Sequence, residues 1–321
     1  MRNFGCSPNT VTYNVLIEGL CKVGYFSDVE KILEESTSMG WKPDVITYSI
    51  YMNGLCKNGD ADKAFEQLEA MLEKGLNPNS VTLNILLDCL CHCSKVWEAE
   101  LLLGRSLELE WDVNVVNYNT VMSGLCKSEK SSAVLKLLGD MMKKGIDPNI
   151  WTFTIVIHSL CRAGKIWEAK FVIERRVFVA NVVTYTILMQ YFCWEGNLGE
   201  VQLLFAKMQV EGIQPNAVTY NVMVDCFCRQ GKYSDAIVYF VKGWVLDFCI
   251  FHSLIKALCR KGYCLGMEIH VLFHLIVARL SNSQSPLRQC FYTVSSGGEV
   301  KKELCRATNP RSSKADESFV K

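Results

Sequence analysis

The sequence predicts an all-α fold, a right-handed superhelical α-solenoid of helix-turn-helix repeats. The first observation is a phrase that recurs about every 35 residues, as NTVTYNVLIEGLC at Asn9, DVITYSIYMNGLC at Asp44 and NSVTLNILLDCLC at Asn79. A fixed period of this length is typical of supersecondary units that stack on one another. The second observation is that apolar residues within each copy follow the helical period. Half of the 321 residues are apolar, which is enough for a continuous core.

Each repeat is expected to contain two helices. In the first copy Tyr13, Ile17 and Leu20 recur at three- and four-residue steps and form one buried stripe. Gly24 closes the turn after this helix, and a second amphipathic stretch follows, as in residues 60–75 of the next copy. Prolines occupy the short connections, where they end one helix before the next begins. Each repeat is therefore predicted to be a helical hairpin.

The repeats divide the chain into segments. We expect the end of an incomplete repeat at residues 1–9, as in a fragment of a longer array, and seven complete repeats over residues 10–247. Their limits are 10–44, 45–79, 80–114, 115–149, 150–181, 182–216 and 217–247. A degenerate eighth repeat is expected over residues 248–280, and a disordered polar tail over residues 281–321. The fifth and seventh repeats are shorter by about one helical turn, so their second helices, or the exits from those helices, are expected to be shorter.

Composition excludes several classes of function. With 34 basic and 33 acidic residues, the chain is not expected to bind polyanions through bulk charge. Eight of the 16 cysteines fall at one repeat position, where neighbours about 8–10 Å apart are too distant to form disulfides. We therefore expect a reduced intracellular compartment. The chain carries no metal-ligand spacing, cofactor loop or catalytic motif, so we predict no metal, no cofactor and no enzymatic activity.

The second, fifth, ninth and thirteenth residues of each repeat are expected to share one stripe of the first helix. The fifth residue is the main candidate for recognition. It is always a short hydrogen-bonding residue, which is a poor helix former. An ordinary solvated helix face would favour Ala, Glu, Lys or Gln instead, so a role in ligand recognition is predicted. The residues are Asn14, Ser49, Asn84, Asn119, Thr154, Thr186 and Asn221.

The last residue of each repeat has two interpretations. Asn and Asp are preferred N-caps for the helix that follows. Capping alone would admit Ser and Thr equally, and neither occurs, so recognition can accompany capping. The residues are Asp44, Asn79, Asn114, Asn149, Asn181, Asn216 and Asp247.

These repeats resemble pentatricopeptide repeats of the P class, possessing the phrases VTYNxLIxGLCKxG and GxxPN or GxxPD over residues 1–280. The GLCKxG phrase is also similar to that of restorer-of-fertility members. The resemblance implies single-stranded RNA as the ligand, read at one base per repeat. It also implies that the fifth and last residues of one repeat jointly choose the base. Carried over to this chain, the seven pairs imply the target 5′-UA(C/U)(C/U)AAU-3′.

Two further sets of residues are candidates for RNA contact. The second residues could wedge bases between neighbouring repeats, or could pack at the edge of the core: Val11, Ile46, Val81, Val116, Trp151, Val183 and Val218. Basic residues at the thirteenth position could meet phosphates, or could lie on a solvated face: Lys22, Lys57, Lys127, Arg162 and Arg229.

Other functions remain open at this level. A helical-repeat scaffold for protein binding is the main alternative, and a truncated copy with little activity is another. The resemblance implies action in mitochondria, with plastids as the alternative, in RNA processing, stability or translation. Recruited RNA-processing proteins would then be partners, and no membrane association is expected.

Overall fold

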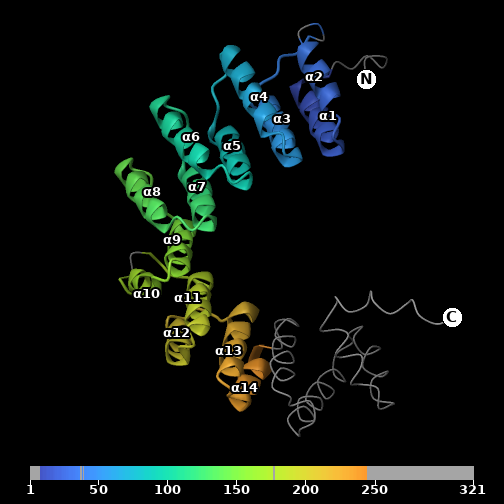
Figure 1. Ribbon diagram of the computed structural model, residues 1–321. Helices are drawn as coiled ribbons and strands as arrows, with labels where there is room; N and C mark the ends of the chain where they lie inside the picture. Colours follow the sequence, from blue (N-terminus) through green and yellow to red (C-terminus); the bar gives the residue numbers. More distant parts are fainter. Residues whose placement is uncertain (1–7, 37, 39, 176–177, 244–321) are drawn as a thin grey trace, which may run out of the picture. The chain divides into compact units, whose positions relative to one another are not determined.

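The computed structural model describes residues 8–243, apart from residues 37, 39, 176 and 177. Within this range the chain forms fourteen α-helices in seven consecutive hairpins, which confirms the predicted all-α class (Figure 1). The first helices of the hairpins are α1 (Thr10–Val23), α3 (Val45–Asn58), α5 (Ser80–His92), α7 (Val115–Lys127), α9 (Ile150–Arg162), α11 (Val182–Trp194) and α13 (Ala217–Arg229). The second helices are α2 (Phe26–Glu34), α4 (Ala61–Glu73), α6 (Val96–Glu108), α8 (Ser131–Lys143), α10 (Ile166–Glu174), α12 (Leu198–Val210) and α14 (Tyr233–Gly243).

Each first helix starts at the first residue of a predicted repeat, because an Asn or Asp caps it. At α9, Asn149 has extended backbone angles, and its Oδ1 accepts from the backbone N–H of Thr152 at 3.0 Å. At α3, Asp44 Oδ1 accepts from the N–H of Thr47 at 2.8 Å. These bonds satisfy backbone donors that have no partner inside the helix. The repeat boundary is therefore set by local chemistry.

The turn after the first helix requires a residue with a left-handed backbone conformation. Gly59 meets this need at the end of α3 with φ of 89°. The third and fourth repeats carry Ser94 and Glu129 at the equivalent place, and both are held at φ of 60°. A residue with a Cβ pays a steric cost in this conformation. The hairpin geometry thus persists where the sequence has lost the glycine.

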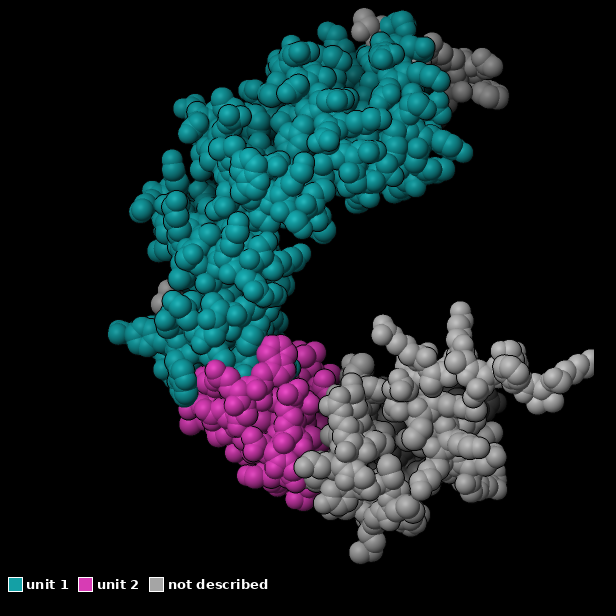
Figure 2. All heavy atoms as spheres, viewed as in Figure 1, with its two compact units in different colours: residues 1–191 teal, residues 192–321 magenta. Residues whose placement is uncertain are grey.

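The chain divides into two compact units, residues 1–191 and 192–321 (Figure 2). In the first unit, α1, α3, α5, α7 and α9 pack side by side in chain order, each also against its own second helix. The aromatic or leucine at the fourth repeat position lies inside, as Tyr48, Leu83 and Tyr118 show with at most 1 % exposure. In the described part of the second unit, α13 packs against α12 and α14. Phe227 there stacks on Tyr239 with ring centroids 5.1 Å apart.

The short fifth repeat loses its residues from the second helix. Helix α10 has nine residues, whereas α8 in the preceding repeat has thirteen. Four residues are about one helical turn, so the apolar face of the shortened helix keeps its direction. Residues 248–280, residues 281–321 and Asp247, for which we predicted an eighth repeat, a tail and a base-choosing residue, lie outside the described residues. Among the described helices, none is both long and apolar enough to cross a bilayer.

Candidate functional site

The second residues of the first helices are exposed. Their side chains are between 38 % and 67 % accessible, so packing at the edge of the core does not describe them. Apolar side chains that repeat at one helix position and face solvent are available to a ligand. Their contact with a base stays a prediction. The residues are Val11, Ile46, Val81, Val116, Trp151, Val183 and Val218.

The fifth residues lie deeper than the sequence led us to expect. Asn14, Ser49, Thr154 and Thr186 are only 6–9 % exposed, and the other three are half-buried. They do not share an open stripe with the second and thirteenth residues. They lie instead at the junctions between successive first helices.

Hydrogen bonds across these junctions give the short polar residues a structural role that sequence reasoning missed. Thr47 Oγ1 donates to Asn14 Oδ1 at 2.7 Å, across the junction between α1 and α3. Ser49 Oγ and Thr82 Oγ1 share a hydrogen bond of 2.7 Å across the next junction. Buried polar groups need such partners. A short side chain at the fifth position is therefore required by packing, whatever it does for a ligand.

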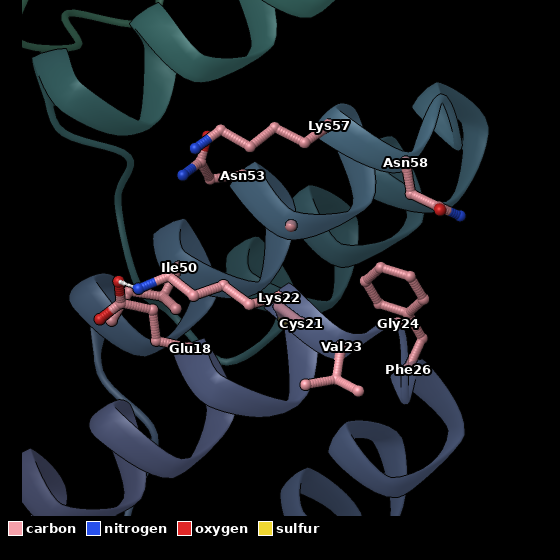
Figure 3. Close-up of a pocket in the computed structure, with 11 residues that line it drawn as sticks. Glu18, Cys21, Lys22, Val23, Gly24, Phe26, Ile50, Asn53, Lys57 and Asn58 are labelled. Atoms are coloured by element: carbon pink, nitrogen blue, oxygen red, sulfur yellow. Dashed lines mark ion pairs between the residues drawn. The ribbon is translucent and has the colours of Figure 1, made fainter.

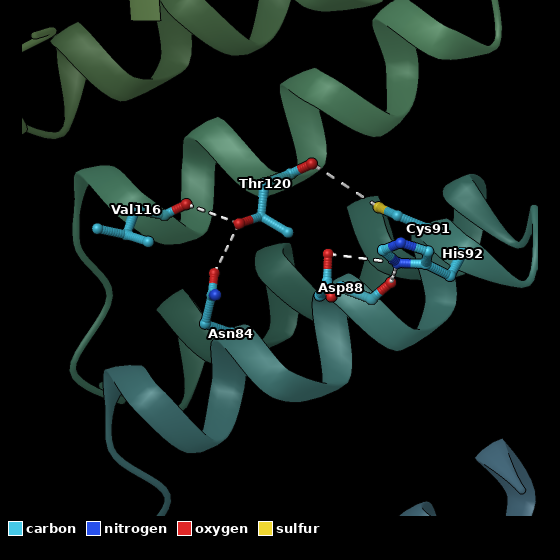
Figure 4. A network of polar contacts seen from close by, with 6 residues as sticks. All are labelled: Asn84, Asp88, Cys91, His92, Val116 and Thr120. Carbon is cyan, nitrogen blue, oxygen red and sulfur yellow. Dashed lines mark hydrogen bonds and ion pairs between the residues drawn. The ribbon is translucent and has the colours of Figure 1, made fainter. Parts of the chain in front are cut away.

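The junction between α5 and α7 uses a different partner (Figure 4). There the third residue of the next repeat is Asn117, whose Nδ2 donates to the backbone oxygen of Ser80 at 2.9 Å. Asn84 Oδ1 accepts instead from Thr120 Oγ1 at 2.7 Å. Close by on α5, His92 Nδ1 lies 2.9 Å from the backbone oxygen of Asp88.

Three fifth residues bond back to their own helix, and one has an oxygen atom without a partner. Ser49 Oγ donates to the backbone oxygen of Val45 at 2.7 Å. Thr154 and Thr186 donate to the backbone oxygens of Ile150 and Val182 at 2.7 and 2.6 Å. Asn221 Oδ1 is buried without a hydrogen-bond partner. The third residue of the repeat that would follow it lies outside the described residues.

The last residues all cap the helix that follows, within the described residues. Asn181, for example, accepts from the N–H groups of Val183 and Thr184, each at 3.0 Å. Capping is confirmed for Asp44, Asn79, Asn114, Asn149, Asn181 and Asn216. A second role in choosing a base stays a prediction.

In the fourth repeat the candidate residues converge on one cavity. A hollow of about 320 Å³ between α7 and α9 is lined by Val116, Asn119, Lys127, Asn149 and Trp151, among others. These are the second, fifth, thirteenth and last residues of this repeat and the second residue of the next. Asn119 Nδ2 donates to Asn149 Oδ1 at 3.2 Å, so the fifth and last residues of one repeat meet there. An apolar wall on two sides with convergent amides suits a small planar group.

A larger hollow of about 660 Å³ lies between α1 and α3 (Figure 3). Glu18 and Lys22 line it from α1, and Asn53 and Lys57 from α3. Gly54 also lines this cavity and Gly124 the other, both at the tenth repeat position. At each of these glycines a cysteine of the preceding first helix, Cys21 or Cys91, occupies the place that a side chain would take.

Comparison with known proteins decides the family. The sequence model of the PPR repeat family matches residues 8–57, 43–92, 113–162 and 180–237. A model of the single PPR repeat matches residues 81–109 and 151–175. These matches cover more than half of the chain. The chain belongs to the pentatricopeptide repeat family.

Solved structures of pentatricopeptide repeat proteins are similar in fold. The crystal structure of PPR10 in complex with an 18-nt psaJ RNA element matches with a TM-score of 0.53 and 20% identity, covering 88% of this chain and 48% of that chain. This likeness confirms the predicted solenoid fold, and the chain spans about half the length of that structure. PPR10 from maize matches with a TM-score of 0.43 and 17% identity, covering 82% of this chain and 53% of that chain. The PPR domain of Arabidopsis thaliana protein-only RNase P 1 in complex with tRNA matches with a TM-score of 0.45 and 12% identity, covering 56% of this chain and 97% of that chain. No curated protein matches the chain significantly.

The basic residues at the thirteenth position of these pentatricopeptide repeats differ in whether they form ion pairs. Three of them form ion pairs of 2.7–3.0 Å with carboxylates: Lys22 with Glu18, Arg162 with Glu129 and Arg229 with Asp225. The hydrogen bond and charge of Lys22 lower the pKa of Glu18, so that pair is ionised at neutral pH. Lys57 and Lys127 are exposed and form no ion pair with any described residue. Exposed ion pairs are weak, so a phosphate could replace the carboxylate in each of the three pairs. Lys57 and Lys127 have no paired carboxylate that a phosphate would have to replace.

None of the cysteines of these pentatricopeptide repeats forms a disulfide within the described residues. The cysteine at the twelfth position meets the tenth residue of the next repeat, as Cys21 meets Gly54 and Cys91 meets Gly124. Burial raises the pKa of Cys21 and of Cys91 to about 11. They are therefore protonated at neutral pH and act as small packing groups. Over the part of the chain that the structure describes, no cluster of His, Cys, Asp and Glu could hold a metal ion.

Proposed function

We propose that this chain binds single-stranded RNA and contacts one base with each repeat. The observation that supports this most directly is the cavity between α7 and α9. Exposed apolar side chains of Val116 and Trp151 flank it, and the amides of Asn119 and Asn149 lie within it. A base has two flat apolar faces and a polar edge, so stacking against such walls and hydrogen bonding to such amides are the interactions it needs.

The proposed target is 5′-UA(C/U)(C/U)AAU-3′. It follows from the fifth and last residues of the seven repeats: Asn14 with Asp44 for uracil, Ser49 with Asn79 for adenine, Asn84 with Asn114 and Asn119 with Asn149 for a pyrimidine each, Thr154 with Asn181 and Thr186 with Asn216 for adenine, and Asn221 with Asp247 for uracil. The amide and hydroxyl groups involved can donate to or accept from the Watson–Crick edge of a base. The PPR10 structure with bound RNA lends support to the ligand class.

Binding would act on RNA in an organelle, the mitochondrion or alternatively the plastid, as the family resemblance implies. An RNA-bound solenoid would affect processing, stability or translation by covering its target. With a net charge of +1, affinity must come from local contacts rather than from the overall charge.

A gel-shift titration at fixed salt tests the proposal. One RNA carries the predicted heptamer, and the other has its fifth and sixth bases changed from adenine to guanine. We expect tighter binding of the first RNA, since a mismatch leaves polar groups of the site without partners. Equal affinity for both RNAs, or no binding of either, would contradict it.

A further inference from the structure

A buried threonine contacts both members of a base-choosing pair, which we define as the fifth and last residues of one repeat. Thr47 is fully buried. Its Oγ1 lies 2.7 Å from Asn14 Oδ1 and 2.9 Å from Asp44 Oδ1. The same oxygen accepts from the backbone N–H of Asp44 at 3.1 Å. Thr47 is the third residue of the second repeat, so the link crosses the junction between α1 and α3.

The arrangement recurs at other junctions of the first unit. Thr152 Oγ1 lies 2.8 Å from Asn119 Oδ1 and 3.2 Å from Asn149 Oδ1. In the second repeat, Ser49 and Asn79 are bridged in the same way by Thr82, at 2.7 and 3.0 Å. All three threonines are fully buried, so water does not compete for the hydroxyl.

The bridge couples the two side chains through a single proton. A hydroxyl has one hydrogen to donate, and Asn14 Oδ1 and Asp44 Oδ1 are both acceptors. When Thr47 donates to Asp44, Asn14 must find another partner, and the reverse also holds. The threonine thus restricts which polar atoms Asn14 and Asp44 turn toward a ligand.

We propose that the buried third-position threonine is a positioning residue, which sets the hydrogen-bond polarity of the base-choosing pair in the preceding repeat. This inference rests on the proposed RNA-binding function. It assigns part of the base preference to a residue that itself lies out of reach of the base.

The third repeat supplies an internal contrast. Its pair is Asn84 and Asn114, and the next repeat has Asn117 at the third position. Asn117 Oδ1 accepts from the N–H of Asn114 at 3.0 Å, whereas Asn84 bonds to Thr120. No single side chain bridges this pair, so its base preference is expected to be weaker than that of the first repeat.

The test uses the full chain with Thr47→Val, which keeps the shape and removes the hydroxyl, and Thr47→Ser, which keeps the hydroxyl. Thr12→Val is the matched control, because among the described residues the Thr12 hydroxyl bonds to the N-cap Asn9 alone, at 3.0 Å. Affinity is measured for four RNAs that differ only in the first base of the heptamer. We expect Thr47→Val to reduce the preference for uracil by about three- to tenfold, the value of one hydrogen bond. Thr47→Ser and Thr12→Val should keep the preference.

Each outcome has a distinct meaning. If wild type prefers uracil and Thr47→Val does so equally, the threonine has no positioning role, although the chain still binds RNA. If Thr47→Val weakens all four RNAs alike while thermal unfolding shifts, its role is only structural and the inference is overturned. If wild type shows no base preference, the proposed function fails and this inference fails with it. A second arm with Thr152→Val, read at the fourth base, repeats the measurement at the cavity.

Discussion

Gly54 and Cys21 touch so closely that no larger residue fits at position 54. A Cβ placed on Gly54 would lie 2.7 Å from Cys21 Sγ and 2.6 Å from Cys21 Cβ. Gly19 holds the same repeat position on α1, and a Cβ there would meet nothing within 4 Å. The two glycines occupy the same repeat position but have different surroundings, because α1 packs against Gly54.

This difference predicts opposite effects of one substitution. Gly54→Ala should destabilise the fold by about 1–3 kcal/mol, the usual cost of overpacking. Gly19→Ala should stabilise it by about 0.5–1 kcal/mol, because alanine is the better helix former. Thermal or urea unfolding of both variants measures this. A stabilised Gly54→Ala variant would show that the junction between α1 and α3 is looser than described.

Ser94 offers a second test of backbone strain. It is held at φ of 60° at the turn after α5, where Gly59 of the preceding repeat has φ of 89°. Ser94→Gly should raise the free energy of unfolding by about 1 kcal/mol, because glycine adopts this conformation without a steric cost. Gly59→Ser should lower it by a similar amount. Urea titrations of the pair measure both, and a shift of the same sign in both variants would argue against this account.

Asn119→Ser should change base preference without harming the fold. The new pair, serine with Asn149, would match Ser49 with Asn79 in the second repeat. The serine can keep the junction bond, since Ser49 and Thr82 share a hydrogen bond of 2.7 Å at the equivalent place. We expect the fourth base preference to move from a pyrimidine to adenine, measured by affinity for the four RNAs that differ there. A protein-binding scaffold would instead show no dependence on that base.

Trp151→Ala should weaken RNA binding by about 1–3 kcal/mol, the usual value of stacking one base on an aromatic side chain. Trp151 is 65 % exposed, so its removal should leave the unfolding temperature nearly unchanged. Trp97→Ala is the control, because Trp97 is 60 % exposed but lies on the second helix α6. Fluorescence anisotropy with labelled RNA measures both variants. An equal loss in the two would exclude a specific role for Trp151.

Thiol reactivity should follow burial. Burial raises the pKa of Cys21 and Cys91 to about 11 and that of Cys228 to about 12, so few thiolates form at pH 8. Iodoacetamide at pH 8, followed by peptide mass spectrometry, should label the exposed Cys93 well before these three. Rapid labelling of Cys21 in the native protein would contradict the described packing.

The same shifts predict how stability depends on pH. Each thiol releases its proton at a lower pH in the unfolded chain, near 9.0, than in the folded chain. The folded state therefore binds more protons above that pH, and stability should fall as pH rises from about 9 toward 11. Unfolding measured across this range shows the sign, and a rise in stability would contradict it.

Much of the architecture could be predicted because its causes are local. Asn149 caps α9, and Gly59 ends α3, through contacts within a few residues of the chain. The helical hairpins and the capping residues were therefore correctly predicted. Val116 and Trp151 are exposed, a point that the sequence left open, and their wedging of bases stays a prediction.

The depth of the fifth residues could not be predicted in the same way. The sequence placed Asn14 beside the exposed Val11 on one stripe, but Asn14 is 9 % exposed and bonded to Thr47. Whether a residue on that stripe meets solvent depends on how closely the next helix approaches, which helical periodicity alone does not state.

By itself, the sequence determined the helices, their caps and the family, because these depend on short-range backbone chemistry and on a phrase repeated along the chain. Only the tertiary structure decided which polar side chains are buried between repeats, that Thr47 touches both Asn14 and Asp44, and that candidate residues of the fourth repeat line an open hollow. Those features join residues about one repeat apart, and they arise from the spacing and rotation of neighbouring helices, which are set by packing rather than by local propensity.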